Sequence, residues 1–540
     1  MIEKMIVLDT ETTGLNPRVN KPTHIGFYNG EFTMVDISDK KDLTDVLGDI
    51  YKTKVPLIMH NGKFDTNMLS WNHGVWIPWT YDTMLLSQLF DSRQKHTLDN
   101  LGQLYLGEGK WGDKKILAAI KKGEFWKLPQ EDQTNYLRRD CEVTWNLFKF
   151  FELKIDQNLW NLYEDFDLPV SLAIANVENN GFTIDTKLLQ QYKKQLEEKY
   201  DLQKQALYEQ FGNINIDSPI QLKRLIEEQL GLEIKSTDEE TLRKLTKYIP
   251  ELSTIIDYRE TKKYAKTYIK NLEENMFEGK VYPQFHLAGD YHASKGRGTQ
   301  TGRTSSSNPN LQNQPRASSG PVCIRKLFTA SPGQVLLAGD YSQLELKVAA
   351  YLSEEWNLLK GDIHQQAADI LKVPRQDGKT CNFAMLYGAT ESKLYQSSHG
   401  SKNVRDYVKW FKQNFPKVIK WTESIRQIVG TEGRVQNFSG RLRYMDDINA
   451  GPNSIIQGTA GDIGKEALLR LYRHNYRILG LIHDEVIVEV PRNYVKQAAD
   501  EMERIMTDGL ELHGPINERV SLEVNCKAGT NWGEMNSVFD

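Results

Sequence analysis

The chain has 540 residues, of which 39% are hydrophobic and 26% are charged, and its formal net charge at pH 7 is −4. This length is too great for one core and predicts three or four domains of roughly 150 residues each, while the composition excludes a disordered or fibrous protein. The small net charge neither favours nor excludes a nucleic acid partner, because local patches decide that interaction.

The cysteines and the apolar runs indicate the compartment. The four cysteines lie far apart and form no CxxC pair, which fits a reducing compartment and gives no zinc signature. No signal or transit peptide is visible at the N-terminus, and no apolar run approaches the ~18 residues of a membrane span. We therefore expect a cytoplasmic protein with no membrane partner.

The first 140 residues contain four acids and a tyrosine in a suggestive order. In the predicted strand MIVLDTETTGL, Asp9 and Glu11 would share one face at the strand exit, because side chains alternate along a strand. Asp65 follows a short apolar run in HNGKFD, and Tyr136 and Asp140 lie four apart in a helical pattern, on one face. The four acids would hold two divalent ions for phosphodiester cleavage, and oxygen ligands suit Mg²⁺ or Mn²⁺.

Each of these patterns is weak alone, because an acid at a strand end is usually a cap or turn residue. The ordered set DxE, NxxFD and YxxxD is far more specific. It resembles the three motifs of the tyrosine-bearing branch of the DEDD exonuclease superfamily. The resemblance implies 3′–5′ hydrolysis of DNA, with Tyr136 orienting the attacking water, the four acids holding the metals and Asp82 acting as a helper near the site.

Residues from about 186 to 275 are largely helical in pattern. Ser218 and the proline after it predict a helix cap and first turn. Further on, Lys262, Lys266 and Lys270 would lie on one helical face. A lone basic stripe is usually a solvated surface, and the alternative is contact with DNA phosphates, which would be independent of sequence and sensitive to salt.

Two later strands each lead to an acid. Asp340 ends the apolar run of VLLAGDYSQLELKVAAYLS, and in LIHDEVIVEV the residues His483, Asp484 and Glu485 separate two β-prone runs. Such runs predict a hairpin, although His-Asp is poor chemistry for a tight turn. A broken local rule favours a functional reason. Together, Asp340 and Asp484 would form a second two-metal site, suited to phosphoryl transfer.

The segment PRQDGKTCNFAMLYG predicts a helix with Arg375, Lys379, Phe383 and Tyr387 on one broad face. The two cations come first, near the helix N-terminus, where backbone N–H groups also favour phosphate. The aromatic rings come later, where a sugar or base would pack. This order matches the polarity of a nucleoside triphosphate. Gly378 costs about 1 kcal/mol of helix propensity, which is compatible with a helix that moves.

These last three segments resemble motifs A, B and C of family A DNA polymerases, and the helical middle block resembles their thumb. The similarity extends through TGRTSSSNPNLQNQP, GDIHQQAA and NSIIQGTAGDI in the family's order. It implies an α/β multidomain fold, with a ribonuclease H-like 3′–5′ exonuclease domain and a right-hand polymerase of palm, fingers and thumb, similar to the Klenow portion of the bacterial repair polymerase. The implied domains are 1–160 (exonuclease), 161–290 (start of the palm and helical thumb), 291–355 (palm with motif A), 356–445 (fingers with the motif B helix) and 446–540 (palm with motif C).

The resemblance also implies residue roles. Asp340, Asp484 and the Tyr341 carbonyl would bind the two catalytic ions, and Glu485 would act in the same site. The nucleotide-binding residues would be Arg375, Lys379, Phe383, Tyr387, His364, Gln343 and Glu345, the last excluding a 2′-hydroxyl. The DNA-binding residues would be Arg303, Asn453, Gln457, His483 and the three thumb lysines. Lys347, Ala384 and Asn449 depart from the family pattern, which bears on fidelity and speed rather than on the reaction.

We therefore predict a template-directed DNA polymerase that adds dNTPs to a primer 3′ end and proofreads with its exonuclease. The partners would be primer–template DNA, dNTPs and two Mg²⁺ ions (alternatively Mn²⁺) per site, with a replication helicase or processivity factor as a further partner of a monomer. The compact chain suggests a phage replication enzyme in the host cytoplasm, with a bacterial source as the alternative. The rivals are a single-subunit RNA polymerase, against which Glu345 argues, and a catalytically inactive DNA-binding subunit, which the full set of acids disfavours.

Overall fold

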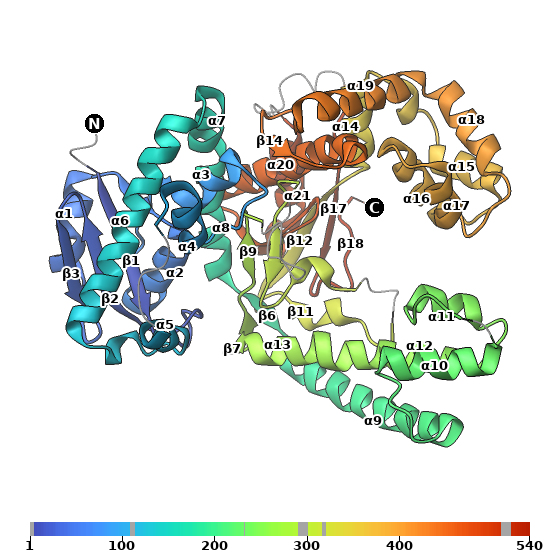
Figure 1. Cartoon of the computed structure of the whole chain (residues 1–540), viewed down its shortest axis with the longest axis horizontal. Helices are drawn as coiled ribbons and strands as arrows, with labels where there is room; N and C mark the ends of the chain where they lie inside the picture. Colours follow the sequence, from blue (N-terminus) through green and yellow to red (C-terminus); the bar gives the residue numbers. More distant parts are fainter. Residues whose placement is uncertain are drawn as a thin grey trace.

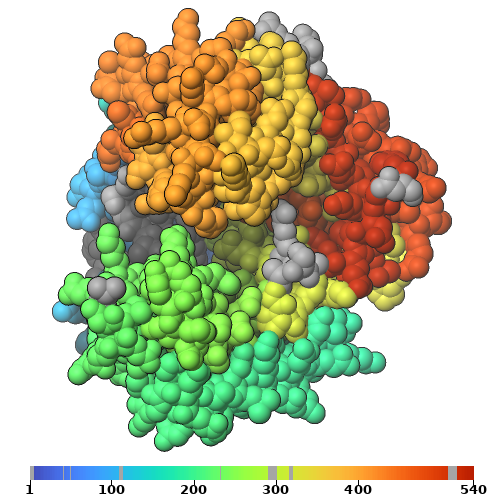
Figure 2. Space-filling model, turned by 90° about the vertical axis from the view of Figure 1, so that its right-hand side faces the viewer, coloured from blue at the N-terminus to red at the C-terminus, as the bar shows by residue number. Residues whose placement is uncertain are grey.

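The computed structural model describes residues 5–40, 42–108, 114–231, 233–289, 301–315, 320–508 and 520–539. Four lobes are visible in Figure 1: a sheet-and-helix lobe on the left, a central lobe around a second sheet, and two helical lobes on the right, one above the other. Figure 2 shows that the two helical lobes face each other across a hollow, with part of the central lobe at its floor. No described helix is long and apolar enough to cross a membrane.

The first lobe is a five-stranded mixed sheet in the order β3-β2-β1-β4-β5. The strands are β1 (Ile6–Thr12), β2 (Pro22–Tyr28), β3 (Phe32–Asp36), β4 (Leu57–Met59) and β5 (Tyr81–Asp82). The helices are α1 (Thr44–Thr53), α2 (Gly62–His73), α3 (Thr83–Phe90), α4 (Leu98–Leu101), α5 (Lys114–Lys121) and α6 (Gln130–Lys154). Helix α6 approaches β2 closely because Gly26 has no side chain: a Cβ there would lie 2.7 Å from Leu137 and 3.0 Å from Cys141. The α6 face that carries Leu137 and Cys141 therefore lies against β2, and Tyr136 and Asp140 each come one residue earlier on the helix.

The lower helical lobe, the thumb, begins with the long helix α9 (Thr186–Phe211). The chain returns through α10 (Pro219–Leu230), α11 (Glu239–Leu245), α12 (Leu252–Lys263), the π-helical η5 (Tyr264–Ile269) and α13 (Lys270–Asn275). The Ser218 side chain accepts a hydrogen bond from the Gln221 amide, and Pro219 opens the helix, as the sequence predicts. The lobe has its own apolar core, formed by residues such as Leu222, Ile226 and Leu252.

The central lobe, the palm, is an antiparallel sheet in the order β15-β16-β12-β17-β18. The strands are β12 (Gln334–Tyr341), β15 (Arg477–Ile482), β16 (Glu485–Pro491), β17 (Val524–Gly529) and β18 (Asn536–Ser537). The helices α8 (Leu168–Asn180), α20 (Gly451–Arg473) and α21 (Val495–Thr507) pack around it. Gly339 in β12 admits two methionines of α21, since a Cβ would lie 2.8 Å from Met506 and 3.0 Å from Met502.

The upper helical lobe, the fingers, is inserted between β12 and α20. Helix α14 (Leu344–Ser353) follows β12 and packs against α20. The helices of the lobe are α15 (Ile363–Leu371), α16 (Arg375–Leu386), α17 (Glu391–Ser397), α18 (Val404–Asn414) and α19 (Pro416–Glu432), followed by the hairpin β13 (Arg434–Gln436) and β14 (Leu442–Tyr444). Helices α15 and α16 touch at Gly378, where a Cβ would lie 2.5 Å from the His364 carbonyl oxygen. The glycine is thus explained by close backbone packing, a cause different from the mobility that the sequence suggests.

Candidate active sites

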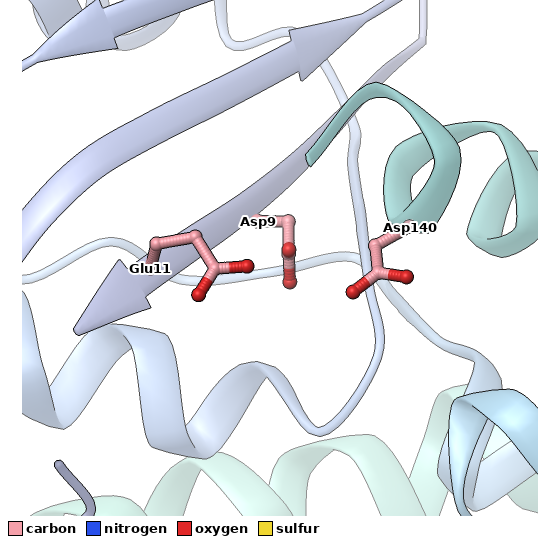
Figure 3. A group of neighbouring side chains, drawn as sticks. All are labelled: Asp9, Glu11 and Asp140. Carbon is pink, nitrogen blue, oxygen red and sulfur yellow. The ribbon is translucent and has the colours of Figure 1, made fainter. Parts of the chain in front are cut away.

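Three of the four acids predicted in the first lobe form a compact group. One carboxylate oxygen from each of Asp9, Glu11 and Asp140 lies within 4.8 Å of the others. Figure 3 shows Asp9 and Glu11 projecting from β1 toward Asp140 on the neighbouring helix α6. Strand alternation puts the first two on one side, and the contact of α6 with the sheet brings the third. The predicted convergence of these three acids is confirmed.

Asp65 is held beside this group by Thr10, the β1 residue between Asp9 and Glu11. Its Oδ1 accepts hydrogen bonds from the Thr10 amide, at 3.0 Å, and from the Thr10 hydroxyl, at 2.6 Å. Asp82 acts on the helix that carries Asp65, because its carboxylate accepts the Asn61 and Gly62 amides at the start of α2, both at 3.0 Å. Asp82 also caps α3. It is therefore a structural support of the site.

A bound cation would stabilise these acids in their ionised form. Burial, reinforced by the neighbouring charges of Asp65, Asp140 and Glu11, raises the pKa of Asp9 well above its usual value. Burial likewise raises the pKa of Asp65 to about 7. Several buried carboxylates close together are stable as anions only beside a positive charge. The all-oxygen donor set fits a hard divalent ion such as Mg²⁺ or Mn²⁺.

Tyr136 lies one helical turn before Asp140 on α6 and is buried. Burial, followed by the charges of Asp140, Glu11 and Asp9, raises the pKa of its hydroxyl, which stays protonated at neutral pH. Its ring packs edge-on against Phe125, with ring centroids 6.0 Å apart. The tyrosine thus presents a fixed, neutral hydroxyl beside the acids.

The second candidate site is in the palm, where the predicted hairpin is confirmed. β15 and β16 are antiparallel, and their last pair is Ile482 opposite Glu485. His483 and Asp484 form the two-residue turn between the strands. β12 pairs with β16 so that Asp340 is directly opposite Glu485, and the Tyr341 amide donates to the Asp484 carbonyl at 3.4 Å. The two predicted metal-binding segments are therefore adjacent.

The turn adopts an uncommon backbone conformation. His483 has a φ of 60°, in the left-handed region, which a two-residue hairpin turn of the favoured kind requires. Burial raises the pKa of Asp484, with Glu345 adding to the effect while His483 and Arg303 oppose it. Glu485 is turned to another partner, since the Trp532 indole donates to its carboxylate at 3.0 Å. Burial raises the pKa of Glu485 as well, so a cation beside the turn would stabilise either carboxylate as an anion.

Glu345, at the start of α14, is bonded to two other predicted ligand-binding residues. Its carboxylate forms an ion pair with Arg303 and accepts a hydrogen bond from the Tyr387 hydroxyl. Gln343 lies just before this helix in the left-handed region, with a φ of 53° and an exposed side chain. The carboxylate is thus fixed between the palm and α16.

Helix α16 displays the predicted row of side chains. Lys379 Nζ lies 5.8 Å from the centroid of the Phe383 ring, and Phe383 lies 5.9 Å from Tyr387. Arg375 is bound to Asp362, with Nε 2.8 Å from the carboxylate, and Asp362 also caps α15. Lys379, Phe383 and Tyr387 line a cavity of about 550 Å³ that extends to Asn449.

Helix α20 carries Asn453 and Gln457 one turn apart. A buried charge network fixes a different face of the same helix: Arg441 donates to Asp167 at 2.7 and 2.8 Å, and also to Asp462 at 3.2 Å. Lys465 completes the network, 2.6 Å from Asp462. Asp167, Arg441 and α20 come from separate segments, so the sequence shows no local signal of their contact.

The predicted basic stripe of the thumb has partners within the lobe. Lys262 forms an ion pair of 2.5 Å with Asp217, and Lys270 lies 3.5 Å from Glu274. Lys266 Nζ lies 6.0 Å from the centroid of the Tyr200 ring. The phosphate contacts of these lysines stay a prediction.

Two family models match the sequence. The one described as DNA polymerase family A matches residues 186–534, and the one described as 3′-5′ exonuclease matches residues 2–156. DNA polymerase I of Borreliella burgdorferi is 27% identical, over 98% of this chain and 62% of its own length. DNA polymerase I of Pseudomonas aeruginosa is 28% identical, over 98% of this chain and 64% of its own length. The chain thus spans about three fifths of the length of these curated relatives.

A solved structure shares the fold. The POL domain of Pol1 from M. smegmatis, in complex with DNA primer-template and dNTP, has a TM-score of 0.81 and 22% identity, and the match covers 98% of this chain and 95% of that one. The lobes and the matches define a protein with a nuclease-type lobe joined to a polymerase-type body. The chain belongs to DNA polymerase family A. This confirms the family and the fold class predicted from the sequence.

Proposed function

We propose that the protein is a DNA-directed DNA polymerase, extending a primer with dNTPs, and that its first lobe is a 3′–5′ proofreading exonuclease. The observation that carries the proposal is the presence of two acidic sites on separate sheets. One joins β1 to α6, and the other joins β12 to the β15–β16 turn. A second, hydrolytic site is the general remedy when pairing energy alone discriminates too weakly.

In the palm, Asp340, Asp484 and the Tyr341 carbonyl would hold two Mg²⁺ ions, or Mn²⁺ as an alternative. Such ions stabilise the attacking and leaving oxygens of phosphoryl transfer. Lys379 and Arg375 would bind the triphosphate, and the latter would exchange Asp362 for phosphate. The row on α16 supports this role, because its cationic end precedes its aromatic end.

Phe383 would pack on the sugar, and Glu345 would exclude a ribose 2′-hydroxyl. The fixed position of Glu345 supports this exclusion, since a carboxylate bound by both Arg303 and Tyr387 does not move aside without losing two bonds. Asn453, Gln457, His483 and the thumb lysines would contact DNA.

In the exonuclease, Asp9, Glu11, Asp65 and Asp140 would hold the divalent ions, and Tyr136 would orient the attacking water. The protonated hydroxyl supports that role, because it both donates and accepts hydrogen bonds. A cavity of about 530 Å³ opens between this lobe and the palm, lined by residues that include Asn61, Phe64, Tyr282 and Gln284. It would admit the single-stranded primer end. A helicase or processivity factor stays a proposed further partner.

The test is extension and shortening of a labelled primer–template with Mg²⁺, with and without dNTPs. Asp340→Ala or Asp484→Ala should abolish extension and leave shortening, whereas Asp9→Ala with Glu11→Ala should do the reverse. Loss of both activities in either variant would contradict two independent sites. Ribonucleotides used at rates near those of dNTPs would favour the RNA polymerase rival, and neither activity in the unaltered protein would favour an inactive DNA-binding subunit.

A further inference from the structure

A buried chain of hydrogen bonds ends on His364. The Tyr407 hydroxyl donates to Asn382 Oδ1 at 2.8 Å, and Asn382 Nδ2 lies 2.8 Å from the Ile363 carbonyl oxygen and 3.1 Å from His364 Nδ1. Asn382 is fully buried on α16, and Tyr407 is fully buried on α18. The chain therefore runs from the core of the fingers to the first turn of α15.

The partners determine where the protons lie. The Ile363 carbonyl only accepts hydrogen bonds, so the Asn382 atom beside it must be the amide nitrogen. The second hydrogen of that nitrogen is then available to His364 Nδ1, which must offer a lone pair. A neutral imidazole carries its one proton on the other nitrogen, Nε2. The geometry thus selects one tautomer of His364.

The charges around His364 keep it neutral. Burial lowers the pKa of its imidazole to about 4, with the nearby cations Lys379 and Arg375 contributing and Asp362 opposing. A third positive charge would be repelled beside those two. At neutral pH the ring is therefore a single N–H donor.

That donor is on the side of the ring away from Asn382. The two ring nitrogens of an imidazole point in diverging directions, and Nδ1 is occupied by the buried Asn382. Among the described residues, none hydrogen-bonds to Nε2. The ring itself lies 5.8 Å from the Phe383 ring, beside the α16 row.

We propose that Asn382 and Tyr407 are positioning residues that fix His364 as a neutral Nε2–H donor to the anionic phosphates of the incoming nucleotide. This inference rests on the proposed function of the fingers. It gives the site one more hydrogen bond without adding to the charge supplied by Lys379 and Arg375. No covalent step is involved.

The direct test is ¹⁵N NMR of histidine-labelled protein, in which the two ring nitrogens report the tautomer. The His364 signals are assigned by their loss in His364→Gln. The unaltered protein should show a protonated Nε2 and an unprotonated Nδ1. The opposite assignment, or an imidazolium at neutral pH, would overturn the inference whether or not the protein copies DNA.

The functional test uses Asn382→Asp, whose carboxylate would accept a hydrogen bond from Nδ1–H and so favour the opposite tautomer. We expect the KM for dNTP to rise roughly tenfold or more, with a smaller change in kcat, because a hydrogen bond to a charged group is lost. Tyr407→Phe, the milder variant, should raise KM a few-fold. Exonuclease activity should not change in either, which also shows that the protein is folded.

Two controls separate positioning from general damage. Asn403→Asp removes a similar bond to α15, since its Nδ2 donates to the Ile370 carbonyl at 3.0 Å without touching a histidine; its KM should stay unchanged. In a His364→Gln background, Asn382→Asp should add little to KM, because the tautomer no longer matters. An undiminished effect there, or an equal effect of Asn403→Asp, would refute the positioning role. Failure of the unaltered protein to extend a primer would instead refute the proposed function.

Discussion

Gly378 offers a sharp test of how closely the proposed nucleotide site depends on helix packing. In Gly378→Ala the new Cβ would lie 2.5 Å from the His364 carbonyl oxygen and 2.8 Å from the Ala368 amide nitrogen. Both are backbone atoms, so no side chain is able to rotate away. Ordinary contact begins at 3.4 Å, and α15 must therefore move away from α16 by about 0.9 Å.

Two opposing effects set the magnitude. Alanine gains about 1 kcal/mol of helix propensity over glycine, whereas overpacking a tight contact costs typically 1–3 kcal/mol. The net change in stability is therefore about 0–2 kcal/mol of destabilisation. The displacement matters more for catalysis, because about 1 Å of misplacement costs on the order of 10²-fold. We expect kcat/KM for dNTP to fall roughly ten- to a hundredfold.

The matched control is Gly430→Ala on α19, where a Cβ would meet nothing within 4 Å. It should stabilise the protein by roughly 0.5–1 kcal/mol and leave nucleotide use unchanged. Single-turnover extension, exonuclease rate and thermal unfolding are measured on both variants. If Gly378→Ala behaves like the control, with unchanged dNTP kinetics, the contact at His364 does not constrain the site.

Two further substitutions test buried charges. Asp462→Asn should cost about 3–5 kcal/mol of unfolding free energy at pH 7, because Arg441 and Lys465 lose a buried counter-ion. Burial alone would raise the pKa of Asp462, but these two cations hold it below its usual range. The stability that ionised Asp462 contributes is therefore complete above about pH 3.9, the pKa of an unfolded aspartate, and is lost as the pH falls through the lower pKa of the folded protein. The free energies of unfolding of the two proteins, measured with denaturant, should converge in acid. Glu178→Ala leaves the largely buried Lys63 without its carboxylate partner. Calorimetry should show that the exonuclease lobe unfolds at a lower temperature, and assays should show a lower exonuclease rate with extension retained. An unchanged unfolding temperature would show that the ion pair does not stabilise the lobe.

The features that sequence predicts correctly are those carried by short segments. Strand alternation places Asp9 and Glu11 together, and a helical spacing of four places Tyr136 above Asp140. The hairpin at His483 and Asp484 follows from two β-prone runs. Each inference needs only a few neighbouring residues, because local backbone periodicity fixes the direction of the side chains.

The contacts between distant segments could not be predicted in this way. Asn382 meets His364 across two helices, 18 residues apart, and Asp167 meets Arg441 across 274 residues. Nothing in the spacing of the motif B residues singles out Asn382. From the sequence, Gly378 indicates a cost in helix propensity and a helix that moves, because the close carbonyl of His364 belongs to another helix. These contacts depend on how the helices pack together, which local sequence patterns do not determine.

The same packing changes how the predicted ligand cations should be understood. Arg375 pairs with Asp362 at the surface, and Arg303 pairs with the partly buried Glu345, so each cation already has a carboxylate partner. Asp362 keeps two backbone amide donors when Arg375 leaves it, which lowers the cost of exchanging that carboxylate for phosphate. Glu345 is also held by the Tyr387 hydroxyl. In the proposed function, nucleotide binding would exchange the Arg375–Asp362 ion pair for an Arg375–phosphate pair, whereas the Arg303–Glu345 pair would stay in place and keep Glu345 fixed.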